Sequence, residues 1–153
     1  MNTERSIISR AAKTRQRGNA MVELALTMSA FFLLTLGAMD FSWAIYAQNF
    51  CSYAAQDAAR WASVHGSQSS SPAAVEDMRA FVQNEGVGLN PGGITVTTCW
   101  SNSCPNTGLP PTGYNAPGST VQVTVQYQIQ PLAGIGFTQT INTSSTGQYL
   151  ISH

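Results

Sequence analysis

The stretch GNAMVELALTMSAFFLLTLGAMDF, residues 18–41, decides the fold. Residues 24–39 carry no charge, and Glu23 and Asp40 stand at the two ends of this apolar run. A membrane-spanning helix needs about 20 mostly apolar residues, so residues 21–43 are long enough if both acids lie near the membrane interfaces. A carboxylate at the bilayer centre costs about 3 kcal/mol on insertion scales. The position of Glu23 therefore calls for a compensating interaction.

The distribution of basic residues predicts the orientation of this span. Five of the seven Lys and Arg residues precede Gly18, namely Arg5, Arg10, Lys13, Arg15 and Arg17. Basic flanks stay in the cytoplasm, and aromatic residues gather at the interfaces, so we expect a cytoplasmic N-terminus and an outer aromatic belt at Trp43 and Tyr46. The rival interpretation is a cleavable secretory signal. Its apolar core is about 7–15 residues long and ends in an A-x-A-like site, whereas this run is longer and follows an acid.

The helical pattern continues beyond the span. Polar residues recur at three- and four-residue spacing at Asn49, Ser52, Gln56, Arg60 and Ser63. The complementary apolar face is expected to comprise Tyr46, Phe50, Tyr53, Ala54, Ala58 and Trp61. One helix over residues 20–64 would be about 65–70 Å long, with an amphipathic, alanine-rich stem. Asp57 and Arg60 are expected to form a local ion pair.

The remainder of the chain predicts a small α+β domain. A short helix is expected to be capped by Ser71, to have Pro72 at its first helical position, and to end at Gly86. Its expected apolar face is Val75, Met78, Phe81 and Val82. Glu76 and Asp77 favour its early turns, and residues 89–93, LNPGG, form a turn.

Strand patterns follow this helix. Residues 94–99 and the alternating stretch 120–130 read as strands, residues 100–119 as loop, and residues 138–142 and 148–152 as weaker strands. A small antiparallel sheet packed on the stem would give both apolar faces a partner. The sheet has no Lys or Glu at its edges. Either loops and neutral polar residues protect these edges, or part of this surface meets another subunit.

The cysteines indicate the compartment. Cys99 and Cys104 lie close together in CWSNSC, so a disulfide is expected if this part is exported, with free thiols as the alternative. Two cysteines without a nearby histidine make a poor zinc signature. Cys51 is expected to be a small buried residue.

Several function classes find no support. Residues 86–151 contain no Asp, Glu, Lys or Arg, so the folded part has no basic surface for nucleic acid. His65 and His153 have no acid or cysteine at ligand spacing, and Asp40 and Asp57 are too far apart for paired acid–base work. We therefore predict no enzyme activity, no cofactor, no metal and no small-molecule substrate.

Gly18 and Glu23 together resemble the processing site of a type IV prepilin, which has a glycine before the cut and a glutamate at the fifth mature position. The resemblance implies that a prepilin peptidase cuts between Gly18 and Asn19. Glu23 of one subunit would then pair with the new amino terminus of its neighbour, which offsets the cost of the buried carboxylate and sets the axial register. The alternative is an ordinary signal anchor whose Glu23 snorkels to the headgroups.

The wider segment 17–66 resembles the TadE-like segment of pseudopilins of the tight-adherence (Tad, type IVc) pilus system. The matching features are Gly18, Val22–Glu23, Asp40–Phe41, and Ala54–Ala55 through Ala59–Arg60. Leu24 departs from the tyrosine that often follows the glutamate in processed Tad pilins, and some TadE-like members stay uncut. The implied partners are the prepilin peptidase, other pseudopilins, the major pilin, the inner-membrane assembly platform and membrane lipid.

The expected architecture is therefore α+β. Residues 1–18 form a basic cytoplasmic leader, residues 19–65 a transmembrane and stem helix, and residues 66–153 a periplasmic domain. The expected role is that of a minor pseudopilin in the bacterial inner membrane or the pilus, with adhesion, DNA uptake or secretion as properties of the pilus. The alternative is an uncleaved, membrane-anchored binding module outside any filament.

Overall fold

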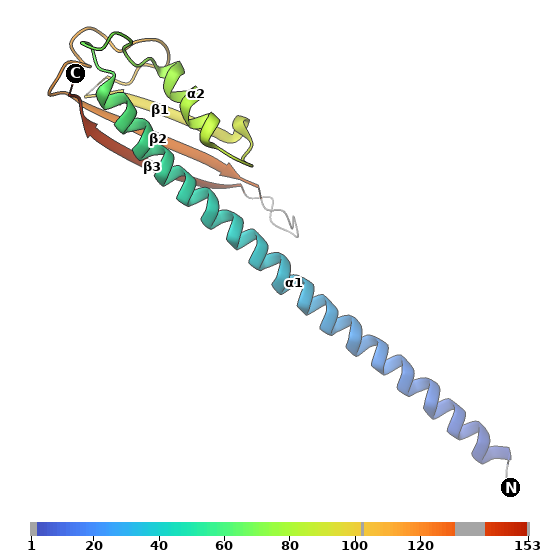
Figure 1. The fold of residues 1–153 in the computed structure, drawn as a ribbon. Helices are drawn as coiled ribbons and strands as arrows, with labels where there is room; N and C mark the ends of the chain where they lie inside the picture. Colours follow the sequence, from blue (N-terminus) through green and yellow to red (C-terminus); the bar gives the residue numbers. More distant parts are fainter. Residues whose placement is uncertain (1–2, 102, 131–139, 153) are drawn as a thin grey trace. The chain divides into compact units, whose positions relative to one another are not determined.

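The structure is a computed structural model that describes residues 3–101, 103–130 and 140–152, with side chains from residue 18 onward. Its elements are α1 (Thr3–Val64), α2 (Val75–Glu85), the 3₁₀ helix η1 (Pro91–Gly93), β1 (Ile94–Trp100), β2 (Thr120–Ile129) and β3 (Ile141–Leu150) (Figure 1). This is the α+β fold with a long apolar N-terminal helix that the sequence predicts.

The chain divides into two compact units, Met1–Phe41 and Ser42–His153. The first unit is the N-terminal part of α1, which begins at Thr3, well before the Ala20 expected from the sequence. Residues 3–17 are rich in Arg, Lys, Ala and Gln, which favour helix. The predicted domain boundaries after residues 18 and 65 remain predictions.

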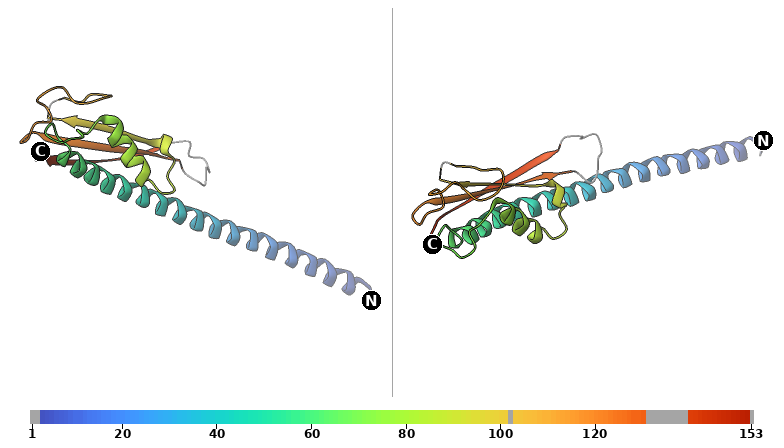
Figure 2. Two further views of the ribbon diagram at one scale, coloured as in Figure 1. Left: turned by 45° about the horizontal axis from the view of Figure 1, so that its top comes forward. Right: turned by 90° about the horizontal axis from the view of Figure 1, so that it is seen from above.

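The second unit has two layers. A three-stranded antiparallel sheet in the order β1-β2-β3 forms one layer, and the C-terminal part of α1 together with α2 forms the other (Figure 2, right view). Alternate residues of β2 point towards the helices and are buried, as the alternation predicts: Val121, Val123, Val125, Tyr127 and Ile129. Their burial supplies much of the hydrophobic stabilisation of this unit.

The buried face of the stem is richer in alanine than expected and lacks two of the predicted aromatic residues. It consists of Ala47, Phe50, Cys51, Ala54, Ala55, Ala58, Ala59 and Ala62. Tyr46 and Tyr53, which were expected on this face, are 41% and 64% exposed. Small side chains let the helix approach the sheet closely, and a tyrosine there would hold the two layers apart. Cys51 is buried, as predicted.

β3 meets the stem at its one buried residue, Gly147. A Cβ atom at this position would lie closer than 3.0 Å to backbone atoms of both Ala55 and Gln56. Gly147 pairs with Val123 in the neighbouring strand, so the register of the sheet places the glycine over the helix. The absence of a side chain is therefore what allows the strand to cross α1.

We expect Gly147→Ala to destabilise the protein by about 1–3 kcal/mol, because the methyl group would meet helix backbone that has no room to move. Gly92→Ala is the matched control, since its Cβ would meet nothing closer than the Asn90 side chain at 3.4 Å. Thermal unfolding followed by circular dichroism in detergent would compare the two variants with the wild type. Equal melting temperatures for all three would contradict the close approach.

The start of α2 differs from the prediction. The helix begins at Val75, not at Ser71 or Pro72. The N–H groups of Ala73 and Val75 instead donate to the carbonyl oxygens of His65 (2.8 Å) and Gly108 (3.0 Å), so these residues join the end of α1 to the 101–119 loop. The expected end at Gly86 and the burial of three apolar residues, Val75, Met78 and Val82, are confirmed.

The two weaker strands are one continuous strand. β3 spans residues 141–150 and pairs with all of β2, from Thr120↔Leu150 to Ile129↔Ile141. Residues 138–139 of the predicted 138–142 strand lie outside the described residues. The sequence TSSTG in the middle of β3 looks like a loop by composition. Its small and polar residues nevertheless suit an edge strand whose centre lies against a helix.

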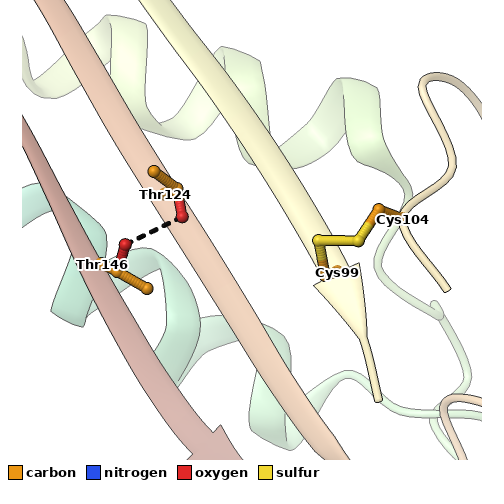
Figure 3. The surroundings of a disulfide bond; sticks show 4 residues. All are labelled: Cys99, Cys104, Thr124 and Thr146. Atoms are coloured by element: carbon orange, nitrogen blue, oxygen red, sulfur yellow. Dashed lines mark hydrogen bonds between the residues drawn. A yellow bond between two sulfur atoms is a disulfide. The ribbon is translucent and has the colours of Figure 1, made fainter. Parts of the chain in front are cut away.

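The outer face of the sheet is polar and uncharged. Thr124 of β2 and Thr146 of β3 share a hydrogen bond of 2.9 Å on this face (Figure 3). At the end of β1, Cys99 and Cys104 form the expected disulfide, which clips the start of the 101–119 loop to the strand (Figure 3). The role of the two sheet edges remains a prediction.

Candidate functional site

The most distinctive surface of the first unit is its apolar segment. Apart from Leu36, its large apolar side chains are 49–76% exposed: Met21, Val22, Leu24, Leu26, Met28, Phe31, Phe32, Leu33, Leu34, Met39 and Phe41. An exposed apolar surface of this extent marks a site for lipid or for other protein chains. Within the described part of the chain, one helix, residues 18–64, has the length and composition to cross a membrane. This helix can serve as a membrane anchor.

The polar groups within this segment are satisfied inside the helix. The hydroxyls of Thr27, Ser29 and Thr35 each donate to the carbonyl oxygen four residues earlier, at 2.8, 2.8 and 2.9 Å. In hydrocarbon an unpaired hydroxyl would be costly, and these bonds remove that cost. The segment is thus suited to lipid although it contains three hydroxyl side chains.

The predicted processing residues lie at the start of this segment. Gly18, Asn19 and Glu23 are all exposed on α1. Asn19 and Glu23 are four residues apart, so they lie on one face of the helix and about 6 Å apart along its axis. A Cβ atom at Gly18 would meet nothing within 4 Å. The Gly18–Asn19 bond and the Glu23 side chain are therefore uncovered by the described residues.

A second set of contacts holds the stem to α2 and to the segment after it. The Tyr46 hydroxyl donates to the carbonyl oxygen of Val87 at 2.7 Å. Trp61 stacks on Phe81 of α2, with ring centroids 5.9 Å apart, and on His65, with centroids 4.0 Å apart. The helical pattern placed Tyr46 and Trp61 on the stem, but two of their partners, Val87 and Phe81, lie far away in sequence.

The local ion pair expected between Asp57 and Arg60 is not formed among the described residues. Asp57 instead lies beside Glu85 of α2. Burial raises the pKa of the Glu85 carboxyl group, and the neighbouring negative charge of Asp57 and a hydrogen bond to it raise this pKa further. Helix packing across the two elements, rather than spacing within one, sets the partner of Asp57.

A raised pKa in the folded state gives the stability a defined pH dependence. The stabilisation of the folded state that is linked to protonation of Glu85 is fully present below the ordinary pKa of 4.5. It is lost as the pH rises through the higher folded-state pKa. We therefore expect Glu85→Gln to stabilise the protein at pH 7 by about 0.5 kcal/mol, a small effect because the carboxylate is still partly solvated. The gain should shrink towards pH 4.5, as measured by thermal unfolding.

Asp77→Asn is the matched control for this prediction. Asp77 is an acid in the first turn of the same helix, and its carboxylate accepts a hydrogen bond from the Ala74 N–H at 3.2 Å. Loss of its charge should destabilise the helix at pH 7. A Glu85→Gln variant less stable than the wild type at pH 7 would show that the two carboxylates do not oppose each other.

The sequence pattern did not predict two further contacts that shape the second unit. The carboxylate of Glu76 accepts hydrogen bonds from the Gly108 N–H at 3.0 and 2.9 Å. Gly147 has no side chain and so leaves room for the backbone of the stem. Their signals in the sequence are weak, because an acid in a first helical turn and a glycine in a polar stretch are both common. Over the described residues, no group of three or more His, Cys, Asp and Glu side chains is placed to hold a metal ion.

Comparison with known proteins identifies one segment. A family model described as TadE-like protein matches residues 18–60. The match contains Gly18, Glu23 and the exposed apolar segment, and it ends in the stem at Arg60. It confirms the resemblance inferred from the sequence. No curated protein and no solved structure matches the chain.

Proposed function

Because residues 18–60 form a TadE-like segment, we propose that the chain is a minor pilin-like subunit for biogenesis of a Tad, type IVc, pilus. The TadE-like segment associates the chain with the Tad pilus system, and the pseudopilin role is the proposal. The observation that carries it is Glu23, exposed five residues after Gly18 at the start of an uncovered apolar helix. The role is structural and non-catalytic.

The proposed chemistry begins with removal of the leader. A prepilin peptidase at the cytoplasmic face hydrolyses the Gly18–Asn19 bond and leaves an ammonium group at Asn19. Glu23 of one subunit then approaches the ammonium group of its neighbour. Each charge lowers the desolvation cost of the other, and the pair forms in only one axial position. The pair thereby sets the register between subunits.

The apolar segment plays two parts in this proposal. Before assembly it anchors the chain in the inner membrane, with the N-terminus in the cytoplasm and the second unit in the periplasm, where the Cys99–Cys104 disulfide is stable. In the assembled state the same side chains pack on the apolar helices of neighbouring subunits. The partners are other pseudopilins, the major pilin and the inner-membrane assembly platform.

The mature N-terminus tests the proposal directly. We expect mass spectrometry of the membrane-extracted protein to find Asn19 as the first residue in cells with the prepilin peptidase and an intact leader in cells without it. Gly18→Val should stay uncut, because a branched side chain replaces the residue before the cut. Gly37→Ala is the matched control, since this glycine lies on the same helix with equally open surroundings, and it should be cut normally.

An intact leader in the presence of the active peptidase would favour the alternative function. The protein would then be an uncleaved single-pass anchor that presents an exported binding module and does not enter a filament. Leu24, in place of the usual tyrosine, is the residue that favours this alternative.

Glu23→Gln tests the register-setting pair. The variant keeps the size of the side chain and removes its charge, so we expect normal membrane insertion and at least a tenfold loss of protein in sheared pilus fractions, which corresponds to about 1.4 kcal/mol. Glu4→Gln is the control, because this acid leaves with the leader. Unchanged amounts of the Glu23→Gln protein in the fibres would rule out a register role for the carboxylate.

A further inference from the structure

One end of the second unit exposes apolar side chains that the proposed function does not use. Val87 is 77% exposed and Ile141 is 53% exposed. Val87 follows α2, and Ile141 begins β3 opposite Ile129, the last residue of β2. The segment after α2, the last residues of β2 and the first residues of β3 lie at the same end of the sheet (Figure 1). We call this end of the second unit, which carries Trp43, Tyr46, Val87 and Ile141, the Val87 end.

Direct contacts join the Val87 end to α1. The Tyr46 hydroxyl donates to the carbonyl oxygen of Val87 at 2.7 Å. Trp43 packs beside Tyr46, with ring centroids 5.6 Å apart. Val87 therefore has a fixed height along α1, close to that of Tyr46.

A groove of about 400 Å³ opens at this end between the helix and the sheet. Its lining is uncharged: Trp43, Gly88, Asn90, Gly92, Gly93, Tyr127, Gln128 and Gln130. Amides and backbone groups provide hydrogen-bonding capacity without the cost of burying an ion. Such a lining is suited to the polar, partly dehydrated layer of lipid glycerol and carbonyl groups.

Charge is also scarce around the Val87 end. Residues 86–151 contain no Asp, Glu, Lys or Arg. The charged residue just before this segment is Glu85, which is half-buried beside Asp57. On α1 the nearest acid is Asp40, which is half-buried three residues before Trp43 in the chain. Exposed apolar side chains with so few charges near them are unfavourable in water and indicate a surface that meets an apolar partner.

The position of this surface along the chain identifies that partner as lipid. Phe41 is the last of the exposed apolar residues of the first unit, and Tyr46 follows it only five residues later in the chain. An interfacial segment lies about 5–10 Å into the boundary between headgroups and acyl chains. Trp43 and Tyr46 are also the residue types that gather at this depth.

We infer that the Val87 end of the second unit lies in the outer interfacial layer of the membrane, with Val87 inserted among the lipid headgroups and Trp43 and Tyr46 beside it. This inference rests on the proposed membrane anchoring by the apolar segment. The second unit is then held against the bilayer at two sequence-distant points, α1 and the segment after α2. Its orientation on the membrane is thereby limited before it meets a partner.

Site-specific labelling in phosphatidylcholine vesicles tests this inference with the full chain. Val87→Cys, Leu109→Cys and Leu33→Cys would each carry an NBD fluorophore. A nitroxide lipid with its spin label near the headgroup would act as the quencher for positions 87 and 109, and one with its spin label deep in the acyl chain would act as the quencher for position 33. Leu109 is the matched control, because it is 57% exposed in the 101–119 loop. Cys51 is buried and Cys99 and Cys104 are bonded to each other, so they do not compete for the label.

We expect at least threefold stronger quenching and a blue-shifted emission at position 87 relative to position 109. Quenching at position 33 verifies the membrane anchor itself. Water-like emission at position 87 with quenching at position 33 would overturn the inference and leave the anchor intact. Absence of quenching at position 33 would overturn both. Protection of position 87 only after addition of another pilus protein would identify a protein interface and also overturn the lipid assignment.

A second variant tests the role of Val87 by charge. Val87→Asp, combined with the label at Ile141→Cys, should reduce quenching at position 141 at least twofold, because a carboxylate opposes insertion into the interface. Val87→Ala is the control and should keep most of the quenching. The high exposure of Val87 makes all three side chains compatible with the fold. Equal quenching for Val87→Asp and Val87→Ala would show that Val87 does not hold this end on the membrane.

Discussion

The structure depends on one constraint, namely that a single helix must satisfy two different environments. The first unit leaves its large apolar side chains uncovered, so the part of α1 before residue 42 requires lipid or other chains around it. The part after residue 42 buries alanine and cysteine beneath a sheet. The change in side-chain size along α1 therefore separates a surface for outside partners from a surface for the chain's own core.

The second unit is compact because small residues face each other where helix and sheet meet. Gly147 on β3 and the alanines of the stem let the two layers approach to backbone contact. Larger residues fill the space towards α2, where Trp61 and Phe81 stack. Close packing of this kind makes the position of the sheet on the helix sensitive to a single methyl group.

Sequence reasoning succeeded where a periodic pattern has one physical interpretation. The alternation in residues 120–129 predicts β2 and its buried face, the spacing of Cys99 and Cys104 predicts their disulfide, and the apolar run predicts the exposed helix. It was less successful where several interactions compete. Ser71 and Pro72 are good helix-start residues, yet hydrogen bonds to the end of α1 and to the 101–119 loop keep this segment extended. The polar centre of β3 looked like a break, because the helix that requires a glycine there is distant in sequence.

The sequence by itself determined the quantities that depend on neighbouring residues: the length of the apolar helix, the placement of Glu23 five residues after Gly18, the uncharged second half of the chain and the fold class. The tertiary structure decided which distant residues meet. It placed Asp57 beside Glu85, Gly147 over Ala55 and Val87 beside Tyr46. These pairings depend on how an alanine-rich face and a twisted sheet fit together in three dimensions, and no local spacing along the chain encodes that fit.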